Sequence, residues 1–281
     1  MPLWIVSTLA ASALFAVSSM VNKLAMRENT PTDCLLPGTF LAGFVLLLTY
    51  HGRSLPTASL SLVASGLGMS LFSMLNCVSI LLALRGGPVG PVAAVAGSHS
   101  ILTPLFALFL FGERLNPWQW VAVGLATAGM AIIQLKQSER SHTAVWIWFS
   151  LALLGALGSS GETLLLDRTV SLQAHGSAGL VWSYFFSFVF VSLWFLRRRQ
   201  LHFGRPFYLG AADGAVSAIG MIFFAKALAD GPAGLVAALS TSAVMLRALG
   251  GRLFFGDSLS AWSWVGMILA VSAFGLVSFF S

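Results

Sequence analysis

The chain has 281 residues, of which 57% are hydrophobic and only 9% are charged. A soluble globular domain carries about 25% charged residues, so this composition excludes a soluble enzyme. The net charge of +6 comes from short polar segments between long apolar runs. That pattern indicates membrane topology and excludes a nucleic-acid-binding surface.

Apolar runs separated by charged or turn residues predict ten transmembrane helices in chain order. A bilayer core about 30 Å thick requires about 20 apolar residues per span, and ten such spans leave no room for a soluble domain. The first run lacks a preceding basic region and a cleavage pattern, so it is expected to be a span and not a signal peptide. The ten segments are 3–24, 34–50, 57–84, 88–111, 117–135, 144–166, 178–196, 206–228, 232–255 and 259–280.

An internal repeat divides these segments into two sets of five. When the chain is shifted by 144 positions, residues 83–126 align with 227–270 without a gap, and 19 of 44 positions are identical. The identical pairs include Gly87 with Gly231 and Gly112 with Gly256, and the same shift aligns Trp4 with Trp148. We therefore predict two five-helix units, residues 1–140 and 141–281.

Five is an odd number, so the second unit must enter the membrane from the opposite face. The predicted fold class is an all-α polytopic membrane protein with ten transmembrane helices as two inverted repeats around a central cavity. Inverted repeats are typical of secondary transporters, which hold substrate near the midplane between the halves. A duplicated membrane scaffold without transport activity is the alternative.

The fourth segment resembles a signature of EamA-type proteins, which belong to the drug/metabolite transporter superfamily. The resemblance lies in the stretch from Gly97 to Phe106 and in the Leu110–Leu115 stretch, and Gly124 and Gly129 in the following span extend it. It implies ten helices around a cavity and transport of a small metabolite or drug-like compound, without choosing the substrate. The second half departs from the pattern, because Arg247-Ala248 stand where the first half has Thr103-Pro104.

Neutral polar side chains near the midplane form the first group of candidate substrate-binding residues. His99 lies near the middle of the fourth span, and Asn76 in the preceding span is expected at the same depth. Thr103 follows on the helical face of His99. These side chains are suited to reading the hydrogen-bond donors and acceptors of a ligand, and interhelical hydrogen bonding is the structural alternative.

Charged residues within spans form the second group, because each is costly in a bilayer and points to function by default. We call the face that carries both termini face T and the other face L. Arg247 is expected roughly 12 Å below face L, and Asp213 about 9 Å below it, given a rise of 1.5 Å per residue. They are predicted to pair, either structurally or with Arg247 gripping a carboxylate or phosphate of the substrate.

Glu162 and Lys226 form a second predicted pair. Glu162 is expected ~7 Å inside face T, and Lys226 at a similar depth. A structural ion pair and a proton-exchanging carboxylate are the two interpretations. Gly155, Gly158 and Ser159 on the same helical face would let a neighbouring helix approach closely.

The sequence predicts no cofactor, no metal site and no catalytic residue. It contains no Gly-rich phosphate loop, so an ATP-driven pump is excluded, and no His/Cys/Asp/Glu cluster has metal-binding spacing. The leading hypothesis is a secondary transporter for an amino-acid-like or organic-acid-like solute that works by alternating access. A lipid flippase, a multidrug exporter and, less favoured, a membrane enzyme are the rivals. Import versus export and the coupling ion are left open.

The expected location is the cell (inner) membrane, as a multi-pass and monomeric protein whose partners are the substrate and the lipid bilayer. Ten Lys and Arg residues fall on face L and four on face T by the predicted segments. The positive-inside rule then predicts that face L is cytoplasmic and that both termini lie outside.

Overall fold

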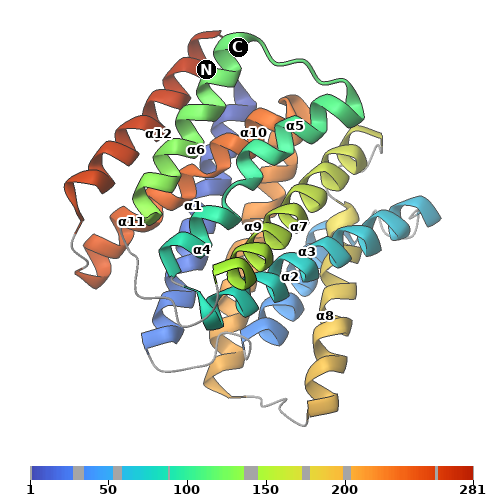
Figure 1. The fold of residues 1–281 in the computed structure, drawn as a ribbon. Coiled ribbons are helices and arrows are strands. Elements are labelled where there is room, and N and C mark those ends of the chain that lie inside the picture. The colour runs from blue at the N-terminus through green and yellow to red at the C-terminus, as the bar shows by residue number, and fades with distance from the viewer. Residues whose placement is uncertain are drawn as a thin grey trace.

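The protein is described from a computed structural model. The structure describes residues 2–27, 35–52, 59–87, 89–135, 145–172, 178–198, 204–256 and 259–280. Helices dominate these residues, which contain no β-strand (Figure 1). The twelve helices of the described chain are α1 (Leu3–Arg27), α2 (Leu36–His51), α3 (Leu60–Gly86), α4 (Val89–Ala96), α5 (His99–Phe111), α6 (Pro117–Leu135), α7 (Val145–Leu172), α8 (Gly179–Arg198), α9 (Arg205–Asp230), α10 (Ala233–Ser240), α11 (Ser242–Phe255) and α12 (Ala261–Phe280).

These helices make ten passages. Within the described chain, eight segments are long and apolar enough to cross a membrane, and the pairs α4–α5 and α10–α11 each count as one of them. The 16-residue α2 is apolar but shorter, and the 19-residue α6 packs along α12. An even number of passages returns the chain to its starting face, and the two termini do lie at the same end of the molecule (Figure 1). The chain is an all-α polytopic membrane protein.

Two of the expected spans are broken near their middles, which the apolar pattern did not predict. The first break is at Gly97-Ser98 between α4 and α5, and the second is at Thr241 between α10 and α11. At both breaks a backbone N–H bonds to the carbonyl three residues earlier, as in a 3₁₀ turn, and not four residues earlier. Ser98 N–H donates to the Val95 carbonyl (3.0 Å), and Thr241 N–H donates to the Ala238 carbonyl (3.3 Å). Such short turns interrupt a helix without exposing many backbone groups.

The two halves share local structure as well as sequence. Gly97 and Thr241 are 144 positions apart, and so are Gly112 and Gly256, which both adopt the left-handed conformation (φ 69° and 71°) at the ends of α5 and α11. Trp4 packs against Gly231, where a Cβ would lie 2.6 Å from its ring. Trp148 packs against Gly87 in the same way. Each tryptophan therefore contacts a glycine of the other half.

The most extensive contacts between the halves are made by α1 with α9, α3 with α7, α6 with α12, and α2 with α9. Glycines bring these helices close together. A Cβ on Gly129 of α6 would lie 2.5 Å from the Gly266 carbonyl oxygen of α12, and a Cβ on Gly158 of α7 would lie 2.7 Å from the Asn76 nitrogen of α3. The predicted close approach beside Ser159 is thus present, and α3 is the helix that approaches.

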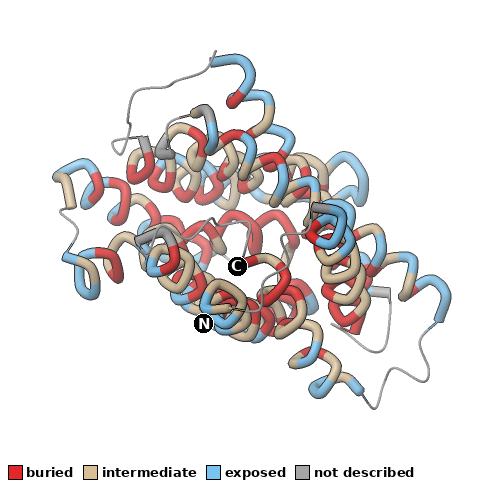
Figure 2. The backbone as a smooth tube through the Cα atoms, turned by 90° about the horizontal axis from the view of Figure 1, so that it is seen from below, coloured by how far each residue is buried: buried red, intermediate tan, exposed pale blue. Residues whose placement is uncertain are grey.

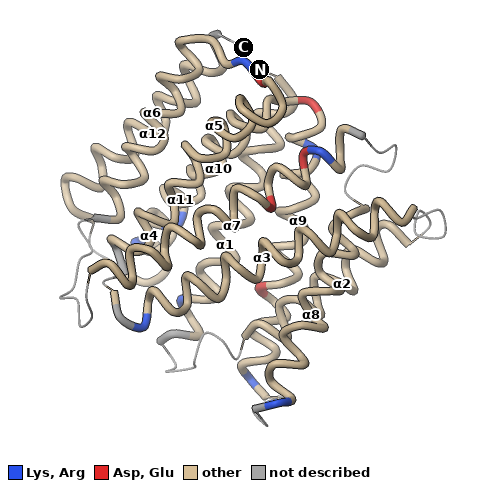
Figure 3. The backbone as a smooth tube through the Cα atoms, turned by 45° about the vertical axis from the view of Figure 1, so that its right-hand side comes forward, with Lys and Arg blue, Asp and Glu red and all other residues tan. Residues whose placement is uncertain are grey.

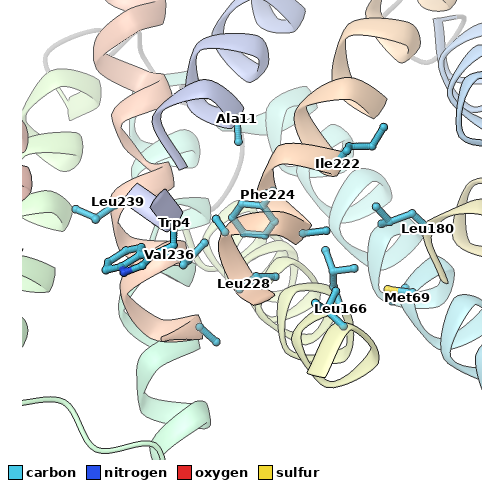
Figure 4. Packing of buried hydrophobic residues seen from close by; sticks show 14 of the residues in the cluster. Trp4, Ala11, Met69, Leu166, Leu180, Ile222, Phe224, Leu228, Val236 and Leu239 are labelled. Carbon is cyan, nitrogen blue, oxygen red and sulfur yellow. The ribbon is translucent and has the colours of Figure 1, made fainter. Parts of the chain in front are cut away.

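Buried residues line the inward faces of the helices, and exposed ones lie on the periphery (Figure 2). Many peripheral side chains are large and apolar, as expected for surfaces that meet lipid. On the face-T side the interior is filled by a hydrophobic cluster that includes Trp4, Leu166, Leu228 and Val236 (Figure 4). These four side chains fill the interior near face T, and other members of the same cluster, such as Phe195 of α8, lie near face L.

Most Lys and Arg residues of the described chain lie toward the end opposite both termini, which is face L (Figure 3). Lys23, Arg85, Arg197, Arg205 and Arg252 are at helix ends on this face. Lys136, Arg140 and Arg199, which also entered the predicted charge asymmetry, lie outside the described residues. The cytoplasmic placement of face L stays a prediction.

Candidate functional site

A cavity of about 450 Å³ lies between the two halves. Helices of both halves form its walls, and both helix breaks border it through Gly97, Ser240 and Thr241. The lining residues are Phe15, Asn76, Ile80, Ala93, Ala96, Gly97, His99, Met130, Gln134, Ser159, Glu162, Thr163, Leu166, Met221, Phe224, Ser240, Thr241, Ala243, Val244 and Arg247. Four of the seven predicted site residues are in this wall: Asn76, His99, Glu162 and Arg247.

Arg247 supplies the positive charge of the cavity. It lies in the second turn of α11, and its side chain is exposed. The predicted pairing with Asp213 is not present: Asp213 has other partners, and Arg247 forms no ion pair with an acidic side chain of the described chain. The pairing failed because depth alone was compared, whereas the rotation of each helix decides which face a side chain occupies.

Glu162 supplies the negative charge. It lies in the middle of α7, where the Ser73 hydroxyl of α3 is within hydrogen-bonding reach of its carboxylate. The predicted pair with Lys226 is also absent, because Lys226 is exposed and its ammonium lies 5.6 Å from the centroid of the Phe223 ring. Counted from the end of α7 instead of from Asp167, Glu162 is deeper than the sequence suggested, since α7 continues to Leu172.

Neutral polar groups complete the cavity wall. His99 is the first residue of α5, and its Nδ1 lies 3.2 Å from the Ala96 carbonyl oxygen across the helix break. In the neutral ring, Nδ1 then donates to that carbonyl and Nε2 is an acceptor. Asn76 of α3 is partly exposed beside it in the wall.

Thr103 is not in the cavity wall. It is fully buried in α5, and its hydroxyl has no hydrogen-bond partner in the described part of the chain. Sequence reasoning missed Gln134, Ser159 and Thr241 of the polar lining. The repeat offered a signal for Thr241, which aligns with Gly97 beside His99, but nothing in the sequence singled out Gln134.

Asp213 lies outside the cavity, at the contact of α9 with α1 and α2. Its carboxylate is 5% exposed and accepts hydrogen bonds from the Ser18 hydroxyl, the Asn22 amide (3.2 Å) and the Thr39 hydroxyl (3.0 Å). Gly214 makes this contact close, because a Cβ there would lie 1.9 Å from the Thr39 carbonyl oxygen. Gly210 and Gly214, two small residues one turn apart, therefore pack α9 against the start of α2.

Glu113 links the halves on the opposite side. It follows α5, and its Oε1 accepts a hydrogen bond from the Gly234 N–H (3.3 Å) at the start of α10. A carboxylate at a helix start satisfies N–H groups that have no partner inside the helix. Burial raises the pKa of Glu113, and the Asp167 charge adds to the rise, while the N–H groups of Gly234 and Ala233 lower it.

The cavity lies mainly toward face L and extends past the midplane, where Leu166 of α7 and Phe224 of α9 line it. Ile80, Ala93, Gln134 and Arg247 lie in the face-L parts of their helices, and the cluster around Trp4 and Leu228 fills the face-T side. Ten passages around a cavity with an acid, a base and neutral polar groups define a multi-pass membrane protein with a polar cavity between its halves.

Comparison with known proteins finds similarity to transporters. Residues 2–135 match the sequence profile of the EamA-like transporter family. A solved crystal structure shares the fold, with a TM-score of 0.80 over 99% of this chain and 97% of the other, at 17% identity. The first half of the chain is thus similar to the EamA-like transporter family, and the chain is similar to proteins named as transporters.

Three relatives match the chain. Two of them are named as transporters, and the third matches over most of the chain. The multidrug transporter PA4990 of Pseudomonas aeruginosa is 39% identical over 72 residues, which is 25% of this chain and 61% of the relative. The uncharacterized transporter YwfM of Bacillus subtilis is 27% identical over 69% of this chain and 65% of the relative. Protein RarD of Streptomyces exfoliatus is 24% identical over 82% of this chain and 70% of the relative. The match thus spans less than two thirds of the first two relatives.

Proposed function

We propose that the protein is a secondary transporter that moves a small zwitterion or organic acid across the cell membrane by alternating access. The observation that carries the proposal is the cavity between the halves, which contains Arg247 without an ion-pair partner in the described chain, Glu162, and both helix breaks. Broken helices at a repeat interface near the midplane are where secondary transporters hold substrates. The match of residues 2–135 to the EamA-like transporter family supports the same proposal.

The chemistry of the wall favours an amino-acid-like substrate. Arg247 matches a carboxylate, because its guanidinium donates two parallel hydrogen bonds. Glu162 matches an ammonium group, and the neutral His99 and Asn76 offer acceptors and donors between them. A volume of about 450 Å³ is within the usual range for small-molecule sites. An organic acid would use Arg247 alone.

Alternation would follow from the contacts between the halves. The cavity lies toward face L, and the apolar cluster around Trp4 and Leu228 blocks face T. Movement of one half against the other along α1–α9 and α3–α7 would open that cluster and close the L side. Enzymatic activity is not part of this proposal, because a substrate bound between two rocking halves is released chemically unchanged.

Uptake into proteoliposomes tests the proposal. Vesicles loaded with unlabelled amino acids or organic acids should exchange them for radiolabelled ones. Arg247→Ala should weaken apparent affinity roughly 10- to 100-fold, since hydrogen bonds to charged groups contribute about 1.5–3 kcal/mol. Arg247→Lys should recover part of it. The matched control is Arg252→Ala on the same helix, whose guanidinium lies over Trp264 at 5.8 Å.

Wild-type protein that exchanges no amino acid, organic acid or sugar derivative would contradict the proposal. Equal loss of exchange in Arg247→Ala and Arg252→Ala would contradict the role of Arg247 in substrate binding. The proposal that the protein is a transporter would then still stand.

Export of an amphipathic cation is a second candidate, and a specific observation favours it. Glu162 lines the cavity, and a carboxylate inside the membrane is the group that a lipophilic cation requires. The relative PA4990 is named a multidrug transporter. For this candidate, accumulation of a quaternary phosphonium cation in inverted vesicles should depend on Glu162, and Glu162→Gln should abolish it while Arg247→Ala does not.

A further inference from the structure

A buried carboxylate between the halves has no role in the cavity. Asp213 of α9 belongs to the second half, and the three side chains that donate to it belong to the first half: Ser18 and Asn22 of α1 and Thr39 of α2. Ser217, one turn further along α9, donates to the Ser18 hydroxyl oxygen (3.0 Å) and extends the network. We call these five residues the Asp213 cluster.

No basic side chain of the described residues balances this charge. Lys23 follows Asn22 on α1, but its ammonium lies 4.9 Å from the centroid of the Phe255 ring, on the side of α11. The titratable groups that sense the Asp213 charge are Tyr184 of α8 and Cys77 of α3, and neither is basic. A lone carboxylate within a span is costly and marks an ion or proton pathway by default.

The Asp213 cluster gathers oxygen atoms from three helices. Two carboxylate oxygens and the hydroxyls of Ser18, Thr39 and Ser217 meet in a site whose acid is 5% exposed, and the Asn22 side-chain nitrogen donates to the same carboxylate. Oxygen atoms are the ligands of hard cations, and the same carboxylate can be neutralised by a proton. A structural hydrogen-bond network would not need an acid here, because neutral donors and acceptors serve it at lower desolvation cost.

We propose that the Asp213 cluster binds a monovalent cation, H⁺ or Na⁺, that drives the transport cycle. This inference rests on the proposed transport function and adds its coupling site. The ionised carboxylate holds α1 and α2 of one half to α9 of the other through three charge-assisted hydrogen bonds. A bound cation neutralises the carboxylate and weakens its hydrogen bonds to those donors. The two halves are then free to move relative to each other.

The cluster is connected to the cavity by the helices that form it. Phe15, three residues before Ser18 on α1, and Met221, eight residues after Asp213 on α9, both line the cavity. Eight residues of helix span about 12 Å. Any shift of α1 against α9 therefore changes the cavity wall and the cation site together, which is the physical link that coupling requires.

The internal repeat indicates that the acid is not a requirement of the fold. By the 144-residue shift, Asp213 aligns with Met69, which is fully buried at the symmetric α3–α7 contact. That contact holds its own acid, Glu162, at the position that aligns with Ser18. Glu162 faces the substrate cavity, whereas Asp213 faces only the cluster. The two acids are thus separated into a substrate role and a coupling role.

Thermal stability of the purified full-length protein in detergent tests the site without any substrate. A cation that binds only the folded state raises the melting temperature by mass action. In the sodium arm, NaCl replaces choline chloride at constant ionic strength, and a saturating rise in melting temperature, about 5 °C at a hundredfold excess over Kd, is expected. In the proton arm, pH is varied in sodium-free buffer, and Asp213 contributes a titration that the variant lacks.

Asp213→Asn should lose whichever response the wild type shows, because the amide keeps the shape of the carboxyl group but binds neither cation. Asp230→Asn at the exposed end of α9 is the matched control and should keep the response, and Glu162→Gln should keep it as well. Responses that are the same in wild type and Asp213→Asn, in both arms, would overturn the proposal.

A transport measurement separates this inference from the proposed function. In proteoliposomes, Asp213→Asn should exchange radiolabelled solute at near wild-type rates but lose concentrative uptake driven by a Na⁺ or pH gradient. Concentrative uptake retained in Asp213→Asn would overturn the coupling site alone. An absence of exchange in wild type would count against the transporter proposal, and the stability result would still decide whether Asp213 binds a cation.

Discussion

At the scale of single residues, comparison of Arg247 with its counterpart in the first half shows that the fold does not require a charge at this position. Its counterpart is the buried Thr103, so the fold accepts a neutral side chain at this position. A charge at a span centre costs ~2.5–3.5 kcal/mol on insertion scales, and contact with the open cavity reduces that cost. Because Arg247 has no acid partner in the described chain, Arg247→Ala should leave folding intact, and adding Asp213→Asn should not restore transport.

Glu113 gives a prediction about pH. Its pKa is raised in the folded protein by burial, so the unfolded chain, with a pKa near 4.3, loses this proton first as pH rises. The unfolded state then binds fewer protons than the folded state, and stability falls with pH over the range that begins near pH 4.3. The contribution of Glu113 to stability is therefore largest in acid and is reduced at neutral pH.

The measurement compares melting temperatures of wild type and Glu113→Gln between about pH 4 and 8. The glutamine amide oxygen can still accept from the Gly234 N–H, so the two proteins should melt together in acid. The variant should become the more stable one as pH rises. A wild type that gains stability over Glu113→Gln toward neutral pH would show that the ionised carboxylate is favoured at α10.

At the scale of elements, close glycine contacts fix which helices meet. Gly214→Ala would place a Cβ 1.9 Å from the Thr39 carbonyl oxygen, which is backbone and cannot rotate away. We expect α9 to move from α2, with a loss above the roughly 1–3 kcal/mol typical of overpacking, and with disruption of the Thr39–Asp213 bond. Melting curves and yield of folded protein measure the effect.

Gly275→Ala on α12 is the matched control, because a Cβ there has no neighbour within 4 Å. Alanine is favoured over glycine in a helix by up to about 1 kcal/mol, so this variant should be as stable as wild type or slightly more stable. Equal destabilisation by both substitutions would mean that the α2–α9 contact is not as close as described.

The sequence predicted the helices α4–α5 and α10–α11 as continuous spans, and it did not predict the breaks within them. The runs 88–111 and 232–255 are predominantly apolar, and a turn of one or two residues leaves that pattern unchanged. Gly97 reduces helix propensity, but Thr241 at the equivalent position does so only weakly. The breaks arise where α4–α5 and α10–α11 border the cavity, so tertiary packing decides them and local propensity does not.

At the scale of the whole molecule, the sequence predicted the fold class and the ten passages, because hydrophobic length and loop polarity determine them directly. It also named four residues that line the cavity, although Glu162 lies deeper than its spacing from Asp167 suggested. It did not predict which polar groups pair, as Asp213 and Lys226 show, since pairing depends on helix rotation. That rotation is set by contacts such as Gly158 with Asn76, which only the assembled structure defines.

The proposed alternating access depends on the sidedness of the cavity, which distinguishes a transporter from a static scaffold. A version without its native cysteines would carry one new cysteine, either Ala243→Cys in the cavity wall or Leu239→Cys in the face-T interior. A membrane-impermeant thiol reagent would then be applied from each face separately.

Without substrate, we predict that Ala243→Cys reacts from face L only and that Leu239→Cys reacts from neither face. With transported solute present, Ala243→Cys should also become reactive from face T while its reaction from face L slows. Reaction of Ala243→Cys from face L that is unchanged by every transported solute, with no reaction from face T, would contradict alternating access through this cavity.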